Sequence, residues 1–464
     1  MNWQTLYSAQ RTGDKEERKP HPDQLRTSFL RDYDRIIFSS AFRRLQNKTQ
    51  VFPLPGAVFV HNRLTHSLEV ACVGRSFGQS VGNALAQKYS NESADFKEFY
   101  KYELSSVIAA ACLAHDIGNP PFGHSGEDAI RTFFRDLDPD TKKILHEELS
   151  ANQIADLENF EGNSNAFRVL THSYNENEAG GYRLTYTTLA AIVKYPSSSQ
   201  EGFSFKKSGL IATKKSGYFD TESDTFKAIA DALGVPVKEG YSNVYARHPF
   251  VYLTEAADDI CYRVIDLEDA HRLHITSLQK IKELFLPFFE KETGYNSVAY
   301  LARKIDNIND DNQKVQYIRA RWIGLMVDKL TNAFMENEAA LLGGTLEKDL
   351  MKCLPADDRK FIEAINEYSV KHVYNYKAVV EIEIAGFNVI GGLLREFITA
   401  VLQPEHARSK KLLQLVSTQF PITKGERTLY QNVLSIVDFI SGMTDLYAID
   451  IYRKITGITI PELR

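Results

Sequence analysis

The stretch CLAHDIGNPPFGHSGE, residues 112–127, contains the features that decide the fold. Apolar residues at helical spacing lead into it over residues 103–115, and the Gly-Asn-Pro-Pro run at 118–121 then ends the helix. On a regular helix, neighbouring side chains point about 100° apart. At a helix end they can converge, so His115 and Asp116 together predict a binding point for one ion.

Helical spacing of apolar residues continues on both sides of this stretch. Further helices are predicted over residues 28–46, 65–86, 147–195 with two loops, 225–233, 253–271, 277–292, 315–338, 359–368, 379–402 and 429–455. Another helix is expected to begin after Ser125. Because strand-like alternation is sparse, the class is predicted as all-α with minor β-hairpin pieces.

Three segments depart from the helical pattern. Residues 1–30 are polar and are expected to form an irregular N-terminal arm. The run VFPLPGAVFVHNR, residues 51–63, holds two prolines and a glycine and predicts a loop or hairpin. Residues 196–224 are rich in Ser, Gly and Lys, with few large apolar residues, so a flexible surface insertion, either a loop or a small hairpin, is expected.

The composition excludes several classes of protein. The chain has 55 basic and 60 acidic residues, and this net charge of -5 argues against a broadly basic surface for nucleic acid, although not against a local phosphate cleft. The four cysteines form no CxxC pair, which favours reduced thiols in a cytoplasmic protein over a disulfide framework. Neither a signal peptide nor a run of about eighteen apolar residues is visible, so no membrane span is expected.

Several residues outside the central stretch strengthen the metal interpretation of His115 and Asp116. An isolated His-Asp pair more often serves surface or helix-cap chemistry. Here, however, His66 lies in NRLTHSLEV, and AADDICY places Asp258 and Asp259 inside an otherwise apolar helix pattern. Buried charges need partners, and one metal ion meets that need for several groups at once. Imidazole and carboxylate ligands together suit Mn, Fe, Co, Ni or Zn, and Mg alone less readily.

The order His66, His115–Asp116, Asp258 resembles the metal-ligand pattern of the HD phosphohydrolase superfamily. More narrowly, blocks spread between Phe42 and Asp445 resemble bacterial deoxyguanosine triphosphate triphosphohydrolases. These blocks are FRRLQNKTQVF, NRLTHSLEV, AHDIGNPPFGHSGE, EGN, VKYP, YLTEAADDICYRVIDLEDA and ISGMTD.

The resemblance implies an HD-domain helical fold and a specific reaction. Residues 31–275 would form the catalytic core, including the insertion at 196–224, and residues 276–464 would complete the nucleotide pocket and make oligomer contacts. The reaction would be metal-dependent hydrolysis of dGTP, or of a wider range of dNTPs, to the deoxynucleoside and intact triphosphate. Water would attack the α-phosphorus, and the cofactor would be a divalent ion, Mn²⁺ or Mg²⁺.

The resemblance also assigns roles to individual residues. His124 becomes the catalytic histidine, since an imidazole can transfer a proton near neutral pH. Glu127, three residues later, would orient it; the alternative is that Glu127 only stabilises a helix N-terminus. Tyr262 and Asp266 form one helical stripe with Asp258, by i, i+4 and i+8 spacing, and would contact the deoxyribose. That stripe favours Asp258 over Asp259 as the metal ligand.

The remaining contacts of the nucleotide follow from the same resemblance. Arg63, Asn163, Lys194 and Tyr195 are matched to the phosphates and the sugar region, Gln46 to the 3′ side of the sugar, and Tyr374 and Glu383 to guanine. Glu381 is an equally good match to Glu383. The family's distal phosphate arginine is not assigned; Arg427 is nearby, but its local sequence matches poorly.

Two other functions fit part of the pattern. One is an HD-type phosphodiesterase or nucleotidase, and the other is a nucleotide-sensing regulator with an inactive site. The dense match around GNPPFGH and AADDICY disfavours the first. Retention of all four metal ligands together with His124 and Glu127 disfavours the second. By resemblance, the partners would be the dNTP substrate, further copies of the chain in a hexamer, and single-stranded DNA as an effector.

Overall fold

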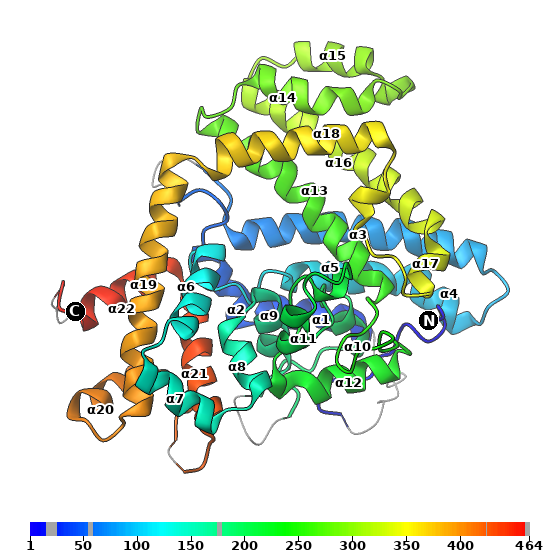
Figure 1. Ribbon diagram of the computed structural model, residues 1–464. Coiled ribbons are helices and arrows are strands. Elements are labelled where there is room, and N and C mark those ends of the chain that lie inside the picture. Colours follow the sequence, from blue (N-terminus) through cyan, green and yellow to red (C-terminus); the bar gives the residue numbers. More distant parts are fainter. Residues whose placement is uncertain (15–25, 54–58, 174–178, 424, 460–464) are drawn as a thin grey trace.

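A computed structural model describes residues 1–14, 26–53, 59–173, 179–423 and 425–459 of the chain (Figure 1). Helices make up nearly all of the regular structure in these residues, which confirms the all-α class. The β structure of the described residues is confined to isolated bridges, such as Val237 with Tyr245 and Ser197 with Val244.

The centre of the molecule is a packed pair of helices, α3 (Arg63–Lys88) and α5 (Leu104–Ala114). The sequence of α5 is almost wholly apolar, which is typical of a fully buried helix. Glycines of α3 face it at four-residue intervals, and a Cβ at Gly78 would lie 2.5 Å from the Cα of Ser105. This close approach brings the start of α3, with His66, beside the end of α5, where His115 lies.

Helix α13 (Pro249–Arg272) crosses the molecule (Figure 1). One end packs in the centre against α3 and α5, and the other reaches the upper group of helices. That group consists of α14 (Leu278–Phe285), α15 (Val298–Asp306), α16 (Asp311–Glu336) and α18 (Ala356–Ser369). The middle of α13 therefore carries Asp258 into the centre of the fold.

A second hydrophobic core lies around α19 (Lys377–Leu402), which runs beside α6 (His124–Arg135) on the left of Figure 1. Helices α20 (Ala407–Leu413), α21 (Leu429–Ser441) and α22 (Asp445–Ile455) pack against α19. Helix α19 is long and apolar enough to cross a membrane, but half of its apolar stretch is buried inside the molecule. It is therefore only weak support for a membrane span.

The other helices are short or connect these elements. They are α1 (Ser28–Phe38), α2 (Ser40–Arg44), η1 (Leu45–Asn47), α4 (Ala94–Glu98), η2 (Phe99–Glu103), α7 (Pro139–Glu148), α8 (Ala151–Glu158), α9 (Gly162–Thr171), α10 (Tyr186–Ala190), α11 (Ser199–Ser204), η3 (Ile211–Thr213), η4 (Asp220–Glu222), α12 (Ser223–Ala232), η5 (Leu286–Phe289), η6 (Gly294–Asn296), α17 (Glu338–Leu342), η7 (Leu350–Cys353) and η8 (Val370–Tyr374).

Two long predicted helices are divided in the structure. The pattern over 28–46 breaks at Ser39, whose hydroxyl accepts the Phe42 N–H and caps α2. The pattern over 429–455 breaks between α21 and α22, where the Thr444 hydroxyl accepts the Tyr447 N–H. In both places a hydroxyl caps the second helix, and apolar periodicity alone does not reveal such a break.

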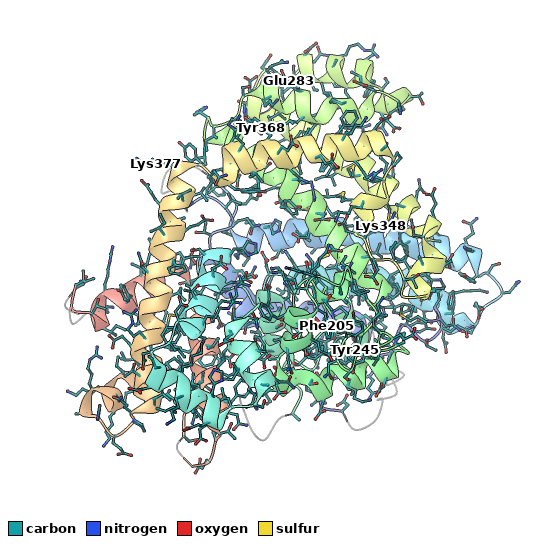
Figure 2. The ribbon with its side chains drawn as sticks, viewed as in Figure 1. Phe205, Tyr245, Glu283, Lys348, Tyr368 and Lys377 are labelled. Carbon is teal, nitrogen blue, oxygen red and sulfur yellow. The ribbon has the colours of Figure 1, made fainter. Side chains whose placement is uncertain are left out.

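The segment 196–224, expected as a flexible surface insertion, is packed into the fold instead. It contains α11, η3 and η4, and Tyr218 and Phe219 are buried. The Ser197 hydroxyl donates to the carbonyls of Ala212 and Lys215, at 2.9 and 3.0 Å. A small hydroxyl side chain thus supplies hydrogen bonds to buried backbone carbonyl groups. A prediction based only on low hydrophobicity cannot detect this kind of packing. Phe205, labelled in Figure 2, marks where this part of the chain lies, below the centre.

The first residues of the predicted arm also pack against the body of the protein. Trp3 and Leu6 are buried, and the Trp3 indole N–H donates to Glu338 Oε1 at 2.6 Å. Residues 1–14 contain no regular helix, α1 begins at Ser28, and residues 15–25 lie outside the described part of the chain; the Trp3 side chain joins the core.

Candidate active site

A cavity of about 630 Å³ opens where α3, α5, α6, α13 and α19 meet. The predicted site residues that line it are Arg63, His66, His115, Asp116, His124, Glu127, Asn163, Lys194, Tyr195, Asp258, Tyr262, Asp266, Tyr374 and Glu383. These residues come from segments spread over most of the chain, so the fold collects into one cavity nearly all the residues that the sequence analysis selected.

Gln46 is the one selected residue that the structure does not bring to the cavity. It is exposed, on η1, whereas Thr49, Gln50 and Val51 line the cavity wall. The predicted sugar contact at Gln46 therefore has no support in the structure, because Gln46 lies on the outward face of η1, which follows α2 directly. Gln50 Oε1 is buried without a hydrogen-bond partner among the described residues, so Gln50 offers an acceptor to a ligand.

A potential metal centre lies at the inner end of the cavity. One ligand atom from each of His66, His115 and Asp116 lies within 4.8 Å of the others. Asp258 Oδ1 lies 3.2 Å from His66 Nε2 and 3.4 Å from His115 Nε2. Two imidazoles and two carboxylates thus converge from three helices, which is a donor set suited to a divalent transition metal.

The hydrogen bonds of His115 fit such an ion. Its Nδ1 lies 2.6 Å from the carbonyl oxygen of Cys112, one turn earlier on α5, and must donate to it. In the neutral ring, Nε2 then carries no proton, and its lone pair is available to a metal ion. That Nε2 is buried and has no hydrogen-bond partner among the described residues. A histidine oriented through its other nitrogen is typical of metal ligands.

Of the two candidate aspartates on α13, Asp258 faces the imidazoles. Lys194 Nζ donates to its Oδ2 at 2.9 Å. Asp259 instead lies 3.2 Å from the guanidinium of Arg263, one turn later on the same helix. Of these two adjacent carboxylates, the geometry therefore favours Asp258, which the spacing of the stripe also favours.

The carboxylate of Asp116 is held on both sides. Arg63 donates to Oδ2 at 2.7 Å, and the Asn119 amide donates to Oδ1 at 2.5 Å. Burial alone raises the pKa of Asp116, but the charges of Arg63 and the two histidines outweigh it and hold that pKa well below its usual range. Asp116 is thus ionised, as a metal ligand must be.

His124 and Glu127 form a separate pair at the start of α6. His124 Nδ1 lies 2.9 Å from Glu127 Oε2, and the Gly162 N–H donates to Glu127 Oε1 at 2.7 Å. The His124 side chain is 82% exposed, whereas that of Glu127 is buried. A fixed, buried carboxylate therefore orients an imidazole whose Nε2 is left for the cavity. The hydrogen bond and charge of Glu127 also raise the pKa of His124.

Cations surround the space between the metal centre and His124. Arg63, Lys194 and Lys215 all line the cavity. Lys215 lies 3.0 Å from Glu161 and also close enough to Glu127 that these carboxylates raise its pKa, against the effect of burial. Lys215 was not among the predicted site residues. It lies in the segment 196–224, which was predicted as a surface insertion, and no motif or spacing around it indicates a site.

The stripe on α13 forms another wall of the cavity. Tyr262 and Asp266 line it, and the Tyr374 hydroxyl donates to Asp266 Oδ2 at 2.8 Å. Burial raises the pKa of Asp266 to about 8, even with that hydrogen bond. Tyr374 ends η8, at the corner between Tyr368 on α18 and Lys377 on α19, both labelled in Figure 2. The upper helices and α19 therefore meet at this wall.

The far end of the cavity is formed by α19. Val379, Ile382 and Glu383 line it, and the backbone carbonyl of Glu383 accepts the Ser125 hydroxyl at 2.5 Å. Glu381 is not part of this lining and lies 3.7 Å from Lys377. Arg427 is also outside it, and its guanidinium lies 3.4 Å from the Ser435 hydroxyl.

Comparison with known proteins places this geometry in a class. Residues 63–195 match a family model described as HD domain. The matched stretch includes His66, His115, Asp116 and His124. Residues 63–195 thus contain an HD domain, and three of the four residues of the metal cluster lie within it.

Full-length relatives narrow the assignment. A deoxyguanosinetriphosphate triphosphohydrolase-like protein of Synechocystis sp. is 36% identical over 464 residues, covering 99% of this chain and 100% of the relative. One of Pseudomonas aeruginosa is 36% identical, with both chains fully covered. The deoxyguanosinetriphosphate triphosphohydrolase of Yersinia enterocolitica is 32% identical, covering 92% of this chain and 93% of its own. The chain belongs to the deoxyguanosinetriphosphate triphosphohydrolase family.

Proposed function

We propose that this protein is a metal-dependent hydrolase that converts dGTP, or a wider range of dNTPs, to the deoxynucleoside and triphosphate. One observation carries the proposal: the same cavity joins a cluster of metal-ligand type to a separate, oriented His124–Glu127 pair. A purely ligand-binding protein has no need of that second pair. The family relationship supplies the substrate class.

The metal would be held by His66, His115, Asp116 and Asp258. A bound divalent cation, with Mn²⁺ or Mg²⁺ as the expected ion, supplies Lewis-acid polarisation of a phosphate oxygen. The chain itself keeps the carboxylates ionised through Arg63 and Lys194 and fixes the His115 ring through Cys112.

The chemical step is attack of water at the α-phosphorus. A new bond forms between the water oxygen and phosphorus, and the bond to the sugar 5′-oxygen breaks. The attacking water releases one proton to solvent, and the 5′-oxygen takes up one proton, so the step balances. His124 is suited to donate this proton, because the hydrogen bond and charge of Glu127 raise its pKa and favour the protonated ring. Glu127 holds Nδ1, so Nε2 is the nitrogen left to face the leaving group.

The cations of the cavity would bind the triphosphate. Arg63, Lys194 and Lys215 offer positive charge without a P-loop, and Asn163 and Tyr195 add polar contacts. Because Lys194 already pairs with Asp258, it would link the phosphates to the metal centre.

The sugar and base would occupy the rest of the cavity. Tyr262 would exclude a 2′-hydroxyl, and Asp266 with Tyr374 would bind the 3′-hydroxyl region; all three residues line the cavity. Glu383 at the far end can accept hydrogen bonds from the N1–H and 2-amino group of guanine, which adenine lacks.

The decisive experiment is hydrolysis of each of the four dNTPs and of GTP, with Mn²⁺ or Mg²⁺ and with chelator, resolving the products. Intact triphosphate and deoxynucleoside from dGTP, no product with chelator and no cleavage of GTP are expected. Release of pyrophosphate or inorganic phosphate would instead indicate a phosphodiesterase or nucleotidase. Nucleotide binding with no product would favour the regulator with an inactive site.

The expected hexamer, the single-stranded DNA effector and the cytoplasmic location stay predictions. Light scattering of the purified chain tests the oligomer, and activity with added single-stranded oligonucleotide tests the effector. Fractionation of the source cells tests the location.

A further inference from the structure

The segment 441–445, within the ISGMTD block, has no part in the reaction described above. It connects α21 to α22 in the C-terminal region. Its Asp445 side chain nevertheless contacts the turn 118–123, which connects the metal ligands His115 and Asp116 to His124. The carbonyl of Ser441 is linked to the same turn through Lys48, which also donates to Asn119. A segment more than three hundred residues away along the chain thus contacts the loop on which the proposed catalytic histidine depends.

Asp445 joins this turn to the opposite wall of the cavity. Its Oδ1 accepts the Phe122 N–H at 3.0 Å, and its Oδ2 accepts the Thr49 N–H at 2.8 Å. The carboxylate is buried, and both Phe122 and Thr49 line the cavity. One side chain therefore sets the separation of two backbone segments that border the site.

Two further buried side chains fix the same turn. Lys48 Nζ donates to the carbonyls of Asn119, at 2.5 Å, and Ser441, at 2.8 Å. Asn165 donates to the carbonyl of Gly118 at 2.6 Å. Asn119 also donates a hydrogen bond to Asp116. The turn is therefore fixed at the residue next to the metal ligands as well as at Phe122.

The backbone of the turn explains why it needs these contacts. The Gly123 N–H donates to the Pro120 carbonyl, which places Phe122 at the third position of a tight turn with φ +63°. That region favours glycine, and a residue with a Cβ persists there only where its surroundings fix it. The Phe122 ring packs against Gly386 of α19, where any side chain would overlap the ring.

A simpler explanation for Asp445 is that it only stabilises the start of α22, as acidic residues in a first turn do. The hydrogen bonds argue against this. The cap of α22 is made by Thr444, whereas both oxygens of Asp445 accept N–H groups from outside its own helix.

We propose that Asp445 is a positioning residue: with Lys48 and Gly386 it holds the strained turn at Phe122, so that His124 faces the metal centre. The proposal rests on the function given above, because that function assigns the proton transfer to His124. Asp445 touches neither the substrate nor the metal ligands and acts only through the backbone of Phe122 and Thr49.

The test is Asp445→Asn, which keeps the size of the side chain but replaces one accepting oxygen with an amide that cannot accept. One of the two N–H groups then loses its partner. We expect kcat to fall about 10- to 100-fold, as displacement of a catalytic group by about 1 Å does. KM and bound metal should change little. The matched control is Asp450→Asn, the same change on the same helix at an exposed residue paired with Lys454, which should leave kcat unchanged.

Hydrogen–deuterium exchange separates this proposal from the proposed function. Asp445→Asn should speed exchange at residues 118–124 and 49–51, and Asp450→Asn should not. If the wild-type protein hydrolyses no dNTP, the proposed function fails, yet the exchange result still decides whether Asp445 holds the turn. Wild-type kcat, or unchanged exchange in both segments, would overturn the proposal.

A second variant approaches the turn from the other side and covers the case that Asp445→Asn does not fold. Gly386→Ala keeps both hydrogen bonds of Asp445 but forces the Phe122 ring to move. The same loss of kcat with retained metal is expected. A fully active Gly386→Ala protein would contradict the role given to the turn.

Discussion

The two ends of the cavity are built in different ways. At the metal end, His66, His115, Asp116 and Asp258 project from α3, α5 and α13, and each has a hydrogen-bond or ion-pair partner in the centre of the fold. At the far end, α19 supplies Val379, Ile382 and the exposed Glu383. The metal end is fixed by buried polar contacts, whereas the far end is one face of one helix.

This difference indicates how the site divides its tasks. Catalytic groups must be held close to one position and orientation, and buried networks of hydrogen bonds provide this precision. Loss of one member leaves its partners buried without hydrogen bonds, which destabilises the whole network. A face with few such contacts can change with smaller consequences. We therefore expect changes at the metal end to abolish activity and changes at the far end to alter which base is preferred.

The largest effect is expected for Asp258→Ala. It removes a carboxylate that contacts both imidazoles and leaves Lys194 without its partner beside them. Bound metal should be lost, and activity should fall at least about 1,000-fold. Metal analysis of the purified variant, together with dGTP turnover, measures both.

Asp259→Ala is the matched control, since the adjacent carboxylate pairs with Arg263 instead. It should keep its metal. Loss of metal in Asp259→Ala and retention in Asp258→Ala would exchange the two assignments.

A large effect without loss of metal is expected for His124→Ala. The imidazole lies outside the cluster of ligands, so the metal should stay while kcat falls about 100- to 10,000-fold. Metal content and kcat are measured on the same preparation. His146→Ala, an exposed histidine on α7, is the control. Near-normal turnover by His124→Ala would remove His124 from the mechanism.

The same contrast separates what the sequence could predict from what it could not. His115, Asp116 and His124 follow from one local stretch, and Asp258, Tyr262 and Asp266 follow from the spacing of one helix. Lys215, Gln50 and Asp445 reach the site or its turn through tertiary contacts between distant segments. Local periodicity contains no information on such contacts. Gln46 illustrates this, because its spacing did not show that Gln50, and not Gln46, lines the cavity; the sugar contact at Gln46 stays a prediction.

A change in pH dependence, with a moderate loss of rate, is expected for Glu127→Gln. The carboxylate of Glu127 raises the pKa of His124 through its hydrogen bond and its charge, so its removal should lower that pKa. If protonated His124 donates the proton, activity is lost as the pH rises through its pKa. The alkaline limb of the kcat profile should then move to lower pH. Asp128→Asn, an exposed neighbour on α6, should leave the profile in place, and an unmoved limb in Glu127→Gln would contradict the pairing.

The smallest effect is expected at the far end, for Glu383→Gln. The amide keeps one accepting oxygen but cannot accept both donors of guanine, so kcat/KM for dGTP should fall about 10-fold. Turnover of dATP should change less, because adenine does not present that pair of donors.

Glu381→Gln is the matched control, two residues away on the same helix and paired with Lys377 outside the cavity. If Glu381→Gln changes base preference and Glu383→Gln does not, the base contact moves to Glu381. If Glu383→Gln abolishes turnover of every dNTP, the far end is as tightly constrained as the metal end, and the division of tasks between them is wrong.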